Sequence, residues 1–113
     1  MSECLFCRIV AGQIPAEIIY SDDEILAFKD INPVAPIHIL IIPKIHISSL
    51  AEVEENDVSL VGRIMGRISL IAKEHCPDDN YRVVTNIGED GGQSVPHLHF
   101  HLLGGRKFGW PPG

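Results

Sequence analysis

Residues 97–103 read His-Leu-His-Phe-His-Leu-Leu, an alternation of imidazole and apolar side chains that is typical of a strand. Side chains of a strand point alternately to its two faces, so this pattern places His97, His99 and His101 together on one face. Successive histidines would stand about 6.5 to 7 Å apart. We expect the apolar face to anchor the strand in a core and the opposite face to display three imidazoles.

The rest of the chain supplies the other elements of an α+β fold. A short helix is expected over residues 3–11, with Ser2 as its cap and Gly12 beyond its end. Further strands are expected over residues 18–20, 24–29, 38–43, 81–87 and 97–103. A long helix, capped by Asn56 or Asp57 and stopped by Pro77, is indicated by one apolar stripe. The stripe consists of Val58, Val61, Ile64, Met65, Ile68, Ile71 and Ala72.

These elements predict a five-stranded antiparallel sheet in meander order, with one long helix and a short N-terminal helix. At 113 residues, the chain is expected to be a single domain over residues 1–113. The formal net charge of −6 argues against broad binding to nucleic acid, because no basic stripe is present to neutralise a phosphate backbone. We expect no membrane partner, since the apolar stretch at 37–42 is too short to span a bilayer.

Three features of the sequence indicate a reduced, cytoplasmic protein. The N-terminus lacks the basic and then apolar layout of a secretory signal. The number of cysteines is odd, and two of the three form a tight pair, which does not suggest a disulfide framework.

Histidines are rarely grouped for packing, since each buried imidazole needs polar partners. The three histidines could simply form a half-exposed polar face of the strand with no catalytic role. Two functional alternatives compete with this. The histidines could ligate a catalytic metal, or His99 could be a nucleophile whose neighbours handle protons and phosphoryl oxygens. The preceding loop, Gly91-Gly92-Gln93-Ser94, favours the second function, because its donors suit an anionic phosphoryl group. A nucleophilic His99 would need its other ring nitrogen to donate to a carbonyl.

The stretch 97–103 resembles the His-φ-His-φ-His-φ-φ motif of the histidine triad family of nucleotide hydrolases and transferases. Residues 4–7, 26–31, 35–38, 42–46, 91–94 and 103–113 resemble the Hint branch of that family. One departure is Pro96, where related chains often carry an aromatic residue; it removes an amide donor just before His97. The resemblance covers nearly the whole chain.

The resemblance implies a hydrolase of purine nucleoside 5′-phosphoramidates that cleaves a P–N bond through a nucleotidyl-histidine intermediate on His99. It also implies a homodimer whose two sheets join, with Trp110 close to the partner's site. By position in the motif, the catalytic residues would be His99, His101, His38 and Ser94. The nucleotide would be bound by Leu5, Phe6, Phe28, Asp30, Ile31, Asn86, Gly92, Gln93, Ser94, His99 and His101.

Cys4-x-x-Cys7 is half of a tetrahedral zinc site, and His46 and His97 are candidates for the other two ligands. Members of the resembled family with this cysteine pair bind zinc through two cysteines and two histidines, whereas other members lack the cysteines and need no metal. A zinc ion here would therefore be structural and not needed for the chemistry. The alternative is that the two thiols pack as small apolar groups.

Two other functions are compatible with the sequence. The first is a metallohydrolase in which His97, His99 and His101 ligate a catalytic ion, so that chelators would abolish turnover. The second is a nucleotide-binding regulatory module whose hydrolysis is incidental, and its binding would survive replacement of His99.

Overall fold

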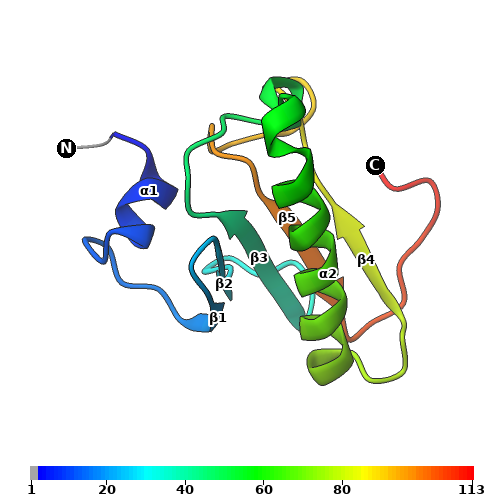
Figure 1. The fold of residues 1–113 in the computed structure, drawn as a ribbon. Coiled ribbons are helices and arrows are strands. Elements are labelled where there is room, and N and C mark those ends of the chain that lie inside the picture. Colours follow the sequence, from blue (N-terminus) through cyan, green and yellow to red (C-terminus); the bar gives the residue numbers. More distant parts are fainter. Residues whose placement is uncertain (1–2) are drawn as a thin grey trace.

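The computed structural model describes residues 3–113 and contains a five-stranded antiparallel sheet with one long and one short α-helix (Figure 1). The strands are β1 Ile18–Ser21, β2 Ile25–Lys29, β3 Ile37–Pro43, β4 Tyr81–Val84 and β5 Phe100–Gly104. The helices are α1 Leu5–Val10 and α2 Val58–His75, and the short 3₁₀ turns Leu50–Glu52 and Glu55–Asp57 precede α2. The predicted α+β class and the elements of the fold are confirmed. Ser2 lies outside the described residues, and Cys4 caps α1 through its Sγ, which accepts the Cys7 N–H at 3.4 Å.

The strand order is β1-β2-β3-β5-β4, so the predicted meander order is wrong at its end. After β3 the chain passes through α2 and returns first at the sheet edge as β4, and β5 then fills the place between β3 and β4. The burial of the two strands explains the order. Four of the five residues of β5 are buried, whereas Val83 of β4 is 40% exposed and tolerates an edge.

The histidine-rich strand is shorter than predicted. Strand β5 begins at Phe100, and the last backbone pair with β4 joins Val84 to His101, so residues 97–99 precede the sheet ladder. Here the Leu98 N–H donates instead to the carbonyl of Ile47, in the loop after β3, at 2.6 Å. Despite this, the alternation holds, because Leu98, Phe100 and Leu102 all lie in the core beneath α2.

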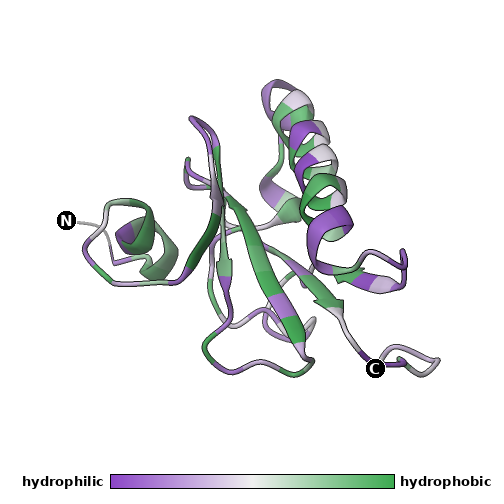
Figure 2. Ribbon diagram, turned by 90° about the horizontal axis from the view of Figure 1, so that it is seen from below, coloured by the Kyte–Doolittle hydropathy of each residue, from purple (hydrophilic) through white to green (hydrophobic). Residues whose placement is uncertain are grey.

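The sheet is covered on both faces, by α2 on one side and by α1 on the other (Figure 2). The buried side chains of α2 are Leu60, Ile64, Ile68, Ile71 and Ala72. The predicted stripe was therefore partly wrong: Val58 and Met65 are 58% and 41% exposed, and Leu60 had been missed. The face of α2 that packs on the sheet includes Leu60 and Ile64, whereas Val58 lies outside this face. On the opposite side, α1 contributes Phe6 to a smaller apolar cluster with β2 and β3.

Candidate active site

His99 lies just before β5 and is buried, with 5% of its surface exposed. Its Nδ1 is 2.7 Å from the carbonyl oxygen of His97. Because a carbonyl only accepts hydrogen bonds, Nδ1 carries the hydrogen and Nε2 keeps its lone pair. The carbonyl partner expected for a nucleophilic imidazole is therefore present.

Two further contacts hold His99. Thr85 directly follows the last residue of β4, and its hydroxyl donates to the His99 carbonyl at 2.8 Å. The ring of Phe6 meets the His99 ring edge-on, with centroids 5.1 Å apart. Thr85 was not among the predicted site residues, because its only signal in the sequence is a hydroxyl at the end of a strand.

His101, on β5, is paired with His38, on β3. The His38 Nδ1 accepts the Val34 N–H at 3.1 Å, so the hydrogen of a neutral His38 is on Nε2. That Nε2 lies 2.9 Å from Nδ1 of His101 and 3.4 Å from Oδ2 of Asp30. Nδ1 of His101 must therefore accept, which leaves the hydrogen of His101 on Nε2. The ring centroids of His101 and His99 are 5.0 Å apart, so the ring that carries this donor neighbours the ring of the candidate nucleophile.

Burial keeps this histidine pair neutral. It lowers the pKa of His101 to about 4, with smaller contributions from the neighbouring His99 and His38. Burial also lowers the pKa of His38, against the opposing effect of the Asp30 carboxylate. Near neutral pH each imidazole thus has one donor and one acceptor nitrogen, as the hydrogen bonds require.

A cavity of about 260 Å³ opens on the α1 side of the sheet. It brings together six of the residues predicted to bind the nucleotide: Leu5, Phe6, Phe28, Asp30, Ile31 and Ser94. Most of the lining is apolar, and the Asp30 carboxylate and Ser94 supply polar groups. A flat apolar group with an attached polar one, such as a nucleoside, suits this lining.

The loop that precedes the histidines is held from within by Gln93. Its Oε1 accepts the Gly88 N–H at 3.0 Å, and its Nε2 donates to the carbonyls of Ser48 at 2.7 Å and Val95 at 3.0 Å. Both ends of this amide therefore support the loop, and contact of Gln93 with phosphoryl oxygens stays a prediction. The predicted contacts Asn86 and Gly92 lie together, with Nδ2 of Asn86 3.5 Å from the Gly92 carbonyl.

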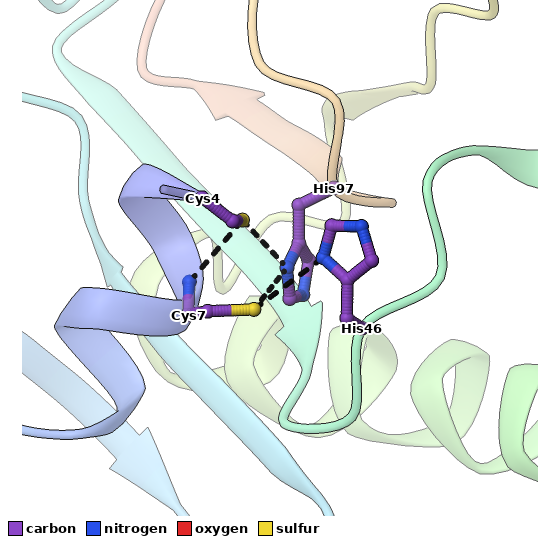
Figure 3. A group of neighbouring side chains, drawn as sticks. All are labelled: Cys4, Cys7, His46 and His97. Carbon is purple, nitrogen blue, oxygen red and sulfur yellow. Dashed lines mark hydrogen bonds between the residues drawn. The ribbon is translucent and has the colours of Figure 1, made fainter. Parts of the chain in front are cut away.

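The four predicted metal ligands form one cluster, shown in Figure 3. Cys4 and Cys7 come from the start of α1, His46 from the loop after β3, and His97 from the segment before β5. Nδ1 of His97 is 3.3 Å from Sγ of Cys4 and 3.5 Å from Sγ of Cys7, and Nδ1 of His46 is 3.4 Å from Sγ of Cys7.

The donor set fits a tetrahedral zinc ion. Zinc bonds of about 2.3 Å to sulfur and about 2.0 to 2.1 Å to nitrogen place neighbouring ligand atoms roughly 3.5 Å apart, close to the observed spacing. Nε2 of His97 is 2.8 Å from the carbonyl of Pro43 and must donate to it, so the lone pair on Nδ1 faces the two sulfurs. Burial also lowers the pKa of His97, which keeps the ring neutral as a ligand must be.

The three histidines of the motif therefore have separate surroundings. His97 faces the cysteines, Nδ1 of His99 is bound to a carbonyl, and His101 faces His38. Among residues 3–113, no group of close ligand atoms contains all three. Asp30, His38 and His101 do lie close enough to hold an ion, but the hydrogen on Nε2 of His38 occupies the position a metal would need. The geometry gives no support to a catalytic metal held by the triad.

Known proteins resemble this chain in sequence and in fold. The HIT domain family model matches residues 11–108. The 14 kDa zinc-binding protein of Zea mays is 46% identical over 114 residues, covering 99% of this chain and 89% of that protein. Adenylylsulfatase HINT1 of Arabidopsis thaliana is 41% identical over 114 residues, covering 99% and 78% respectively. The crystal structure of a HIT family hydrolase from Legionella pneumophila Philadelphia 1 has a TM-score of 0.95 and 47% identity, and covers 98% of this chain and 100% of that one.

Proposed function

The chain belongs to the HIT domain family, and on that premise we propose that it hydrolyses purine nucleoside 5′-phosphoramidates through a nucleotidyl-histidine intermediate on His99. The observation that carries the proposal is the position of the ring hydrogen on each of the neighbouring residues His99 and His101. The Nδ1–H of His99 is bound to the His97 carbonyl, which leaves Nε2 as a lone pair, and His101 presents an N–H beside it. A nucleophile, and beside it a hydrogen-bond donor for the leaving nitrogen, suit cleavage of a P–N bond.

The substrate would place its base against the apolar wall of the cavity, near Phe6 and Phe28, and its ribose hydroxyls on Asp30. Oδ1 of Asp30 accepts the Asn32 N–H at 2.7 Å, which fixes the carboxylate and leaves Oδ2 toward the histidines. Such positioning matters because phosphoryl transfer depends on alignment and charge stabilisation more than on a strong base. Ser94, at the rim of the same cavity, would contact the phosphoryl group or the leaving nitrogen.

In the first step, Nε2 of His99 attacks phosphorus, a P–N bond forms to the imidazole, and the P–N bond to the leaving group breaks. The N–H of His101 donates a hydrogen bond to the leaving nitrogen, which takes a proton from a solvent molecule and departs as a neutral amine. In the second step, a water molecule attacks phosphorus and gives its proton to solvent. The bond to His99 breaks, the nucleoside monophosphate is released, and the His99 ring returns to its starting state.

We propose that the cluster of Cys4, Cys7, His46 and His97 binds a structural zinc ion, as the names of the zinc-binding relatives and the tetrahedral donor set support. A zinc ion bound there supplies a cross-link between α1, the loop after β3 and the segment before β5. Through α1 it holds Phe6, and through His97 it holds the carbonyl that accepts the His99 hydrogen. None of the four ligands takes part in the transfer itself.

The remaining expectations are also part of the proposal. We propose that residues 1–113 form a single HIT domain and that two copies associate through β4, whose outer edge has no strand partner among residues 3–113. We place the protein in the cytoplasm, because a thiolate-rich cluster needs reducing conditions. In the described part of the chain, neither helix has the length and apolar character of a membrane span.

The test is mass spectrometry of protein quenched during turnover of an adenosine phosphoramidate. We expect one added nucleotidyl group on the peptide that contains His99, and its absence in His99→Asn. His75→Asn is the matched imidazole control, because His75 is not in the lining of the nucleotide cavity, although it shares a second pocket with Asp30 and His38, and it should keep the adduct. Turnover should persist with a chelator present. An adduct on another residue, or turnover by His99→Asn at the normal rate, would contradict the proposal.

A further inference from the structure

Val34 is held at both of its main-chain polar groups. Its N–H donates to Nδ1 of His38 at 3.1 Å, and its carbonyl accepts from Nε and Nη2 of Arg106 at 3.3 and 3.2 Å. Arg106 comes from the C-terminal segment just after β5, whereas Val34 lies in the loop between β2 and β3. One arginine thus holds the residue that fixes the hydrogen on His38.

Arg106 is itself held in place. Its guanidinium lies 4.3 Å from the centroid of the Phe108 ring, and its Nη1 donates to the Lys107 carbonyl at 3.1 Å. Arg82, on β4, lies 5.1 Å from the centroid of the same ring, but its Nη2 donates to the Gly109 carbonyl at 2.6 Å. The two arginines therefore share an aromatic partner, and of the hydrogen bonds that these two side chains make within residues 3–113, only those of Arg106 reach Val34.

We propose that Arg106 is a positioning residue that sets the direction of hydrogen donation in the His38–His101 pair, an inference that rests on the proposed function of His101. While Val34 is held, Nδ1 of His38 accepts and the hydrogen of His101 is on Nε2, where it faces the substrate. If the Val34 N–H moves away, His38 gains the alternative tautomer with a hydrogen on Nδ1. Nε2 of His38 then accepts, the hydrogen of His101 moves to Nδ1, and a lone pair instead of a donor faces the substrate.

The loop around Val34 has few other contacts that fix its position, so the hydrogen bonds from Arg106 matter. Val34 is 61% exposed and Ile31 is 88% exposed, so apolar burial contributes little to fixing their place. Pro33 and Pro36 have no N–H to donate. Two hydrogen bonds from one guanidinium to the same carbonyl are a directional restraint for such a segment.

The experiment compares Arg106→Met with Arg82→Met, since both lose a guanidinium from the Phe108 ring and only one loses the bonds to Val34. Two quantities are measured: steady-state kinetics on an adenosine phosphoramidate, and the ¹⁵N chemical shifts of labelled histidine rings without substrate, which distinguish protonated from unprotonated nitrogens. We expect Arg106→Met to lower kcat by about tenfold to a hundredfold, because the hydrogen bond from His101 to the leaving nitrogen is lost, with little change in KM. Nδ1 of His38 and His101 should become partly protonated, and Arg82→Met should keep the original tautomers.

Unchanged tautomers of His38 and His101 in folded Arg106→Met would overturn the inference, as would an equal loss of kcat in both variants. If Arg106→Met melts below the assay temperature, Val34→Pro tests the same point, because it removes the N–H that His38 accepts. It must then give the same tautomer change and the same loss of kcat, and failure of either counts against the inference. The ring shifts need no substrate, so a wild-type protein without phosphoramidate turnover would refute the proposed function separately.

Discussion

Acidification should destabilise the folded protein through His101. The pKa of this residue is about 4 in the folded chain, lowered mainly by burial from its ordinary value of about 6.5. Between pH 6.5 and pH 4 the unfolded chain therefore binds a proton at His101 that the folded chain does not bind. Stability rises with pH wherever the unfolded state binds more protons, so the free energy of unfolding should fall as the pH is lowered through this window.

The size of the effect follows from the shift. Lowering the pKa from about 6.5 in the unfolded chain to about 4 in the folded chain corresponds to a loss on the order of 3 kcal/mol between pH 7 and pH 4. That is a large part of the stability of a small domain, which is about 5 to 15 kcal/mol. Above pH 6.5 the penalty vanishes, and below pH 4 it is complete and constant.

The assay is urea denaturation at several pH values between 7 and 4, followed by far-UV circular dichroism of α2. Trp110 is 85% exposed, so its fluorescence would report unfolding poorly. The wild type is compared with His101→Gln, which keeps a polar side chain but cannot titrate. Carboxylates and the cysteine–histidine cluster titrate in both proteins, so the difference between the two curves reports His101 together with its coupling to the neighbouring His38 and His99.

We expect the wild type to lose stability relative to His101→Gln as the pH falls, with most of the change between pH 6 and pH 4. A difference that stays flat over this range, or that changes in favour of the wild type, would show that the folded protein accepts the proton on His101. In that case the neutral donor assigned to His101 at the active site would be wrong.

Three further predictions concern the site and its supports. Removal of metal from the Cys₂His₂ cluster by a chelator should lower the melting temperature while nucleotide hydrolysis persists at temperatures where the chain stays folded; loss of turnover from a fully folded chain would refute a structural role. Thr85→Val should cost about 1 to 3 kcal/mol of stability, because the His99 carbonyl loses its donor, and Thr85→Ser should restore most of it; equal melting of the two variants would contradict this. Gly91→Ala should disrupt the loop before the histidines and lower turnover, because a Cβ there strikes the carbonyl oxygen of Ile87; Gly109→Ala meets nothing and should match the wild type in the same kinetic assay.

The sequence predicted the strands well where apolar residues were continuous or strictly alternating. The run at 38–43 proved to be a buried strand, and the apolar residues of 97–103 entered the core as expected, since alternation fixes the face of a side chain whatever its neighbours are. The strand order was not predictable from the same patterns, because a pattern shows that a strand is buried but not which strands flank it. The start of β5 was also missed, because the backbone of Leu98 bonds to Ile47 outside the sheet ladder.

The sequence alone determined that three imidazoles gather on the face opposite the core and that a cysteine pair stands ready for a metal. Only the tertiary structure decided what each imidazole does. The hydrogen on a neutral ring is placed by whichever donor or acceptor meets it, and those partners belong to other segments or to the backbone path. Pro43 directs His97 toward the cysteines, the His97 carbonyl prepares His99 to attack, and Val34 acts through His38 to turn His101 into a donor.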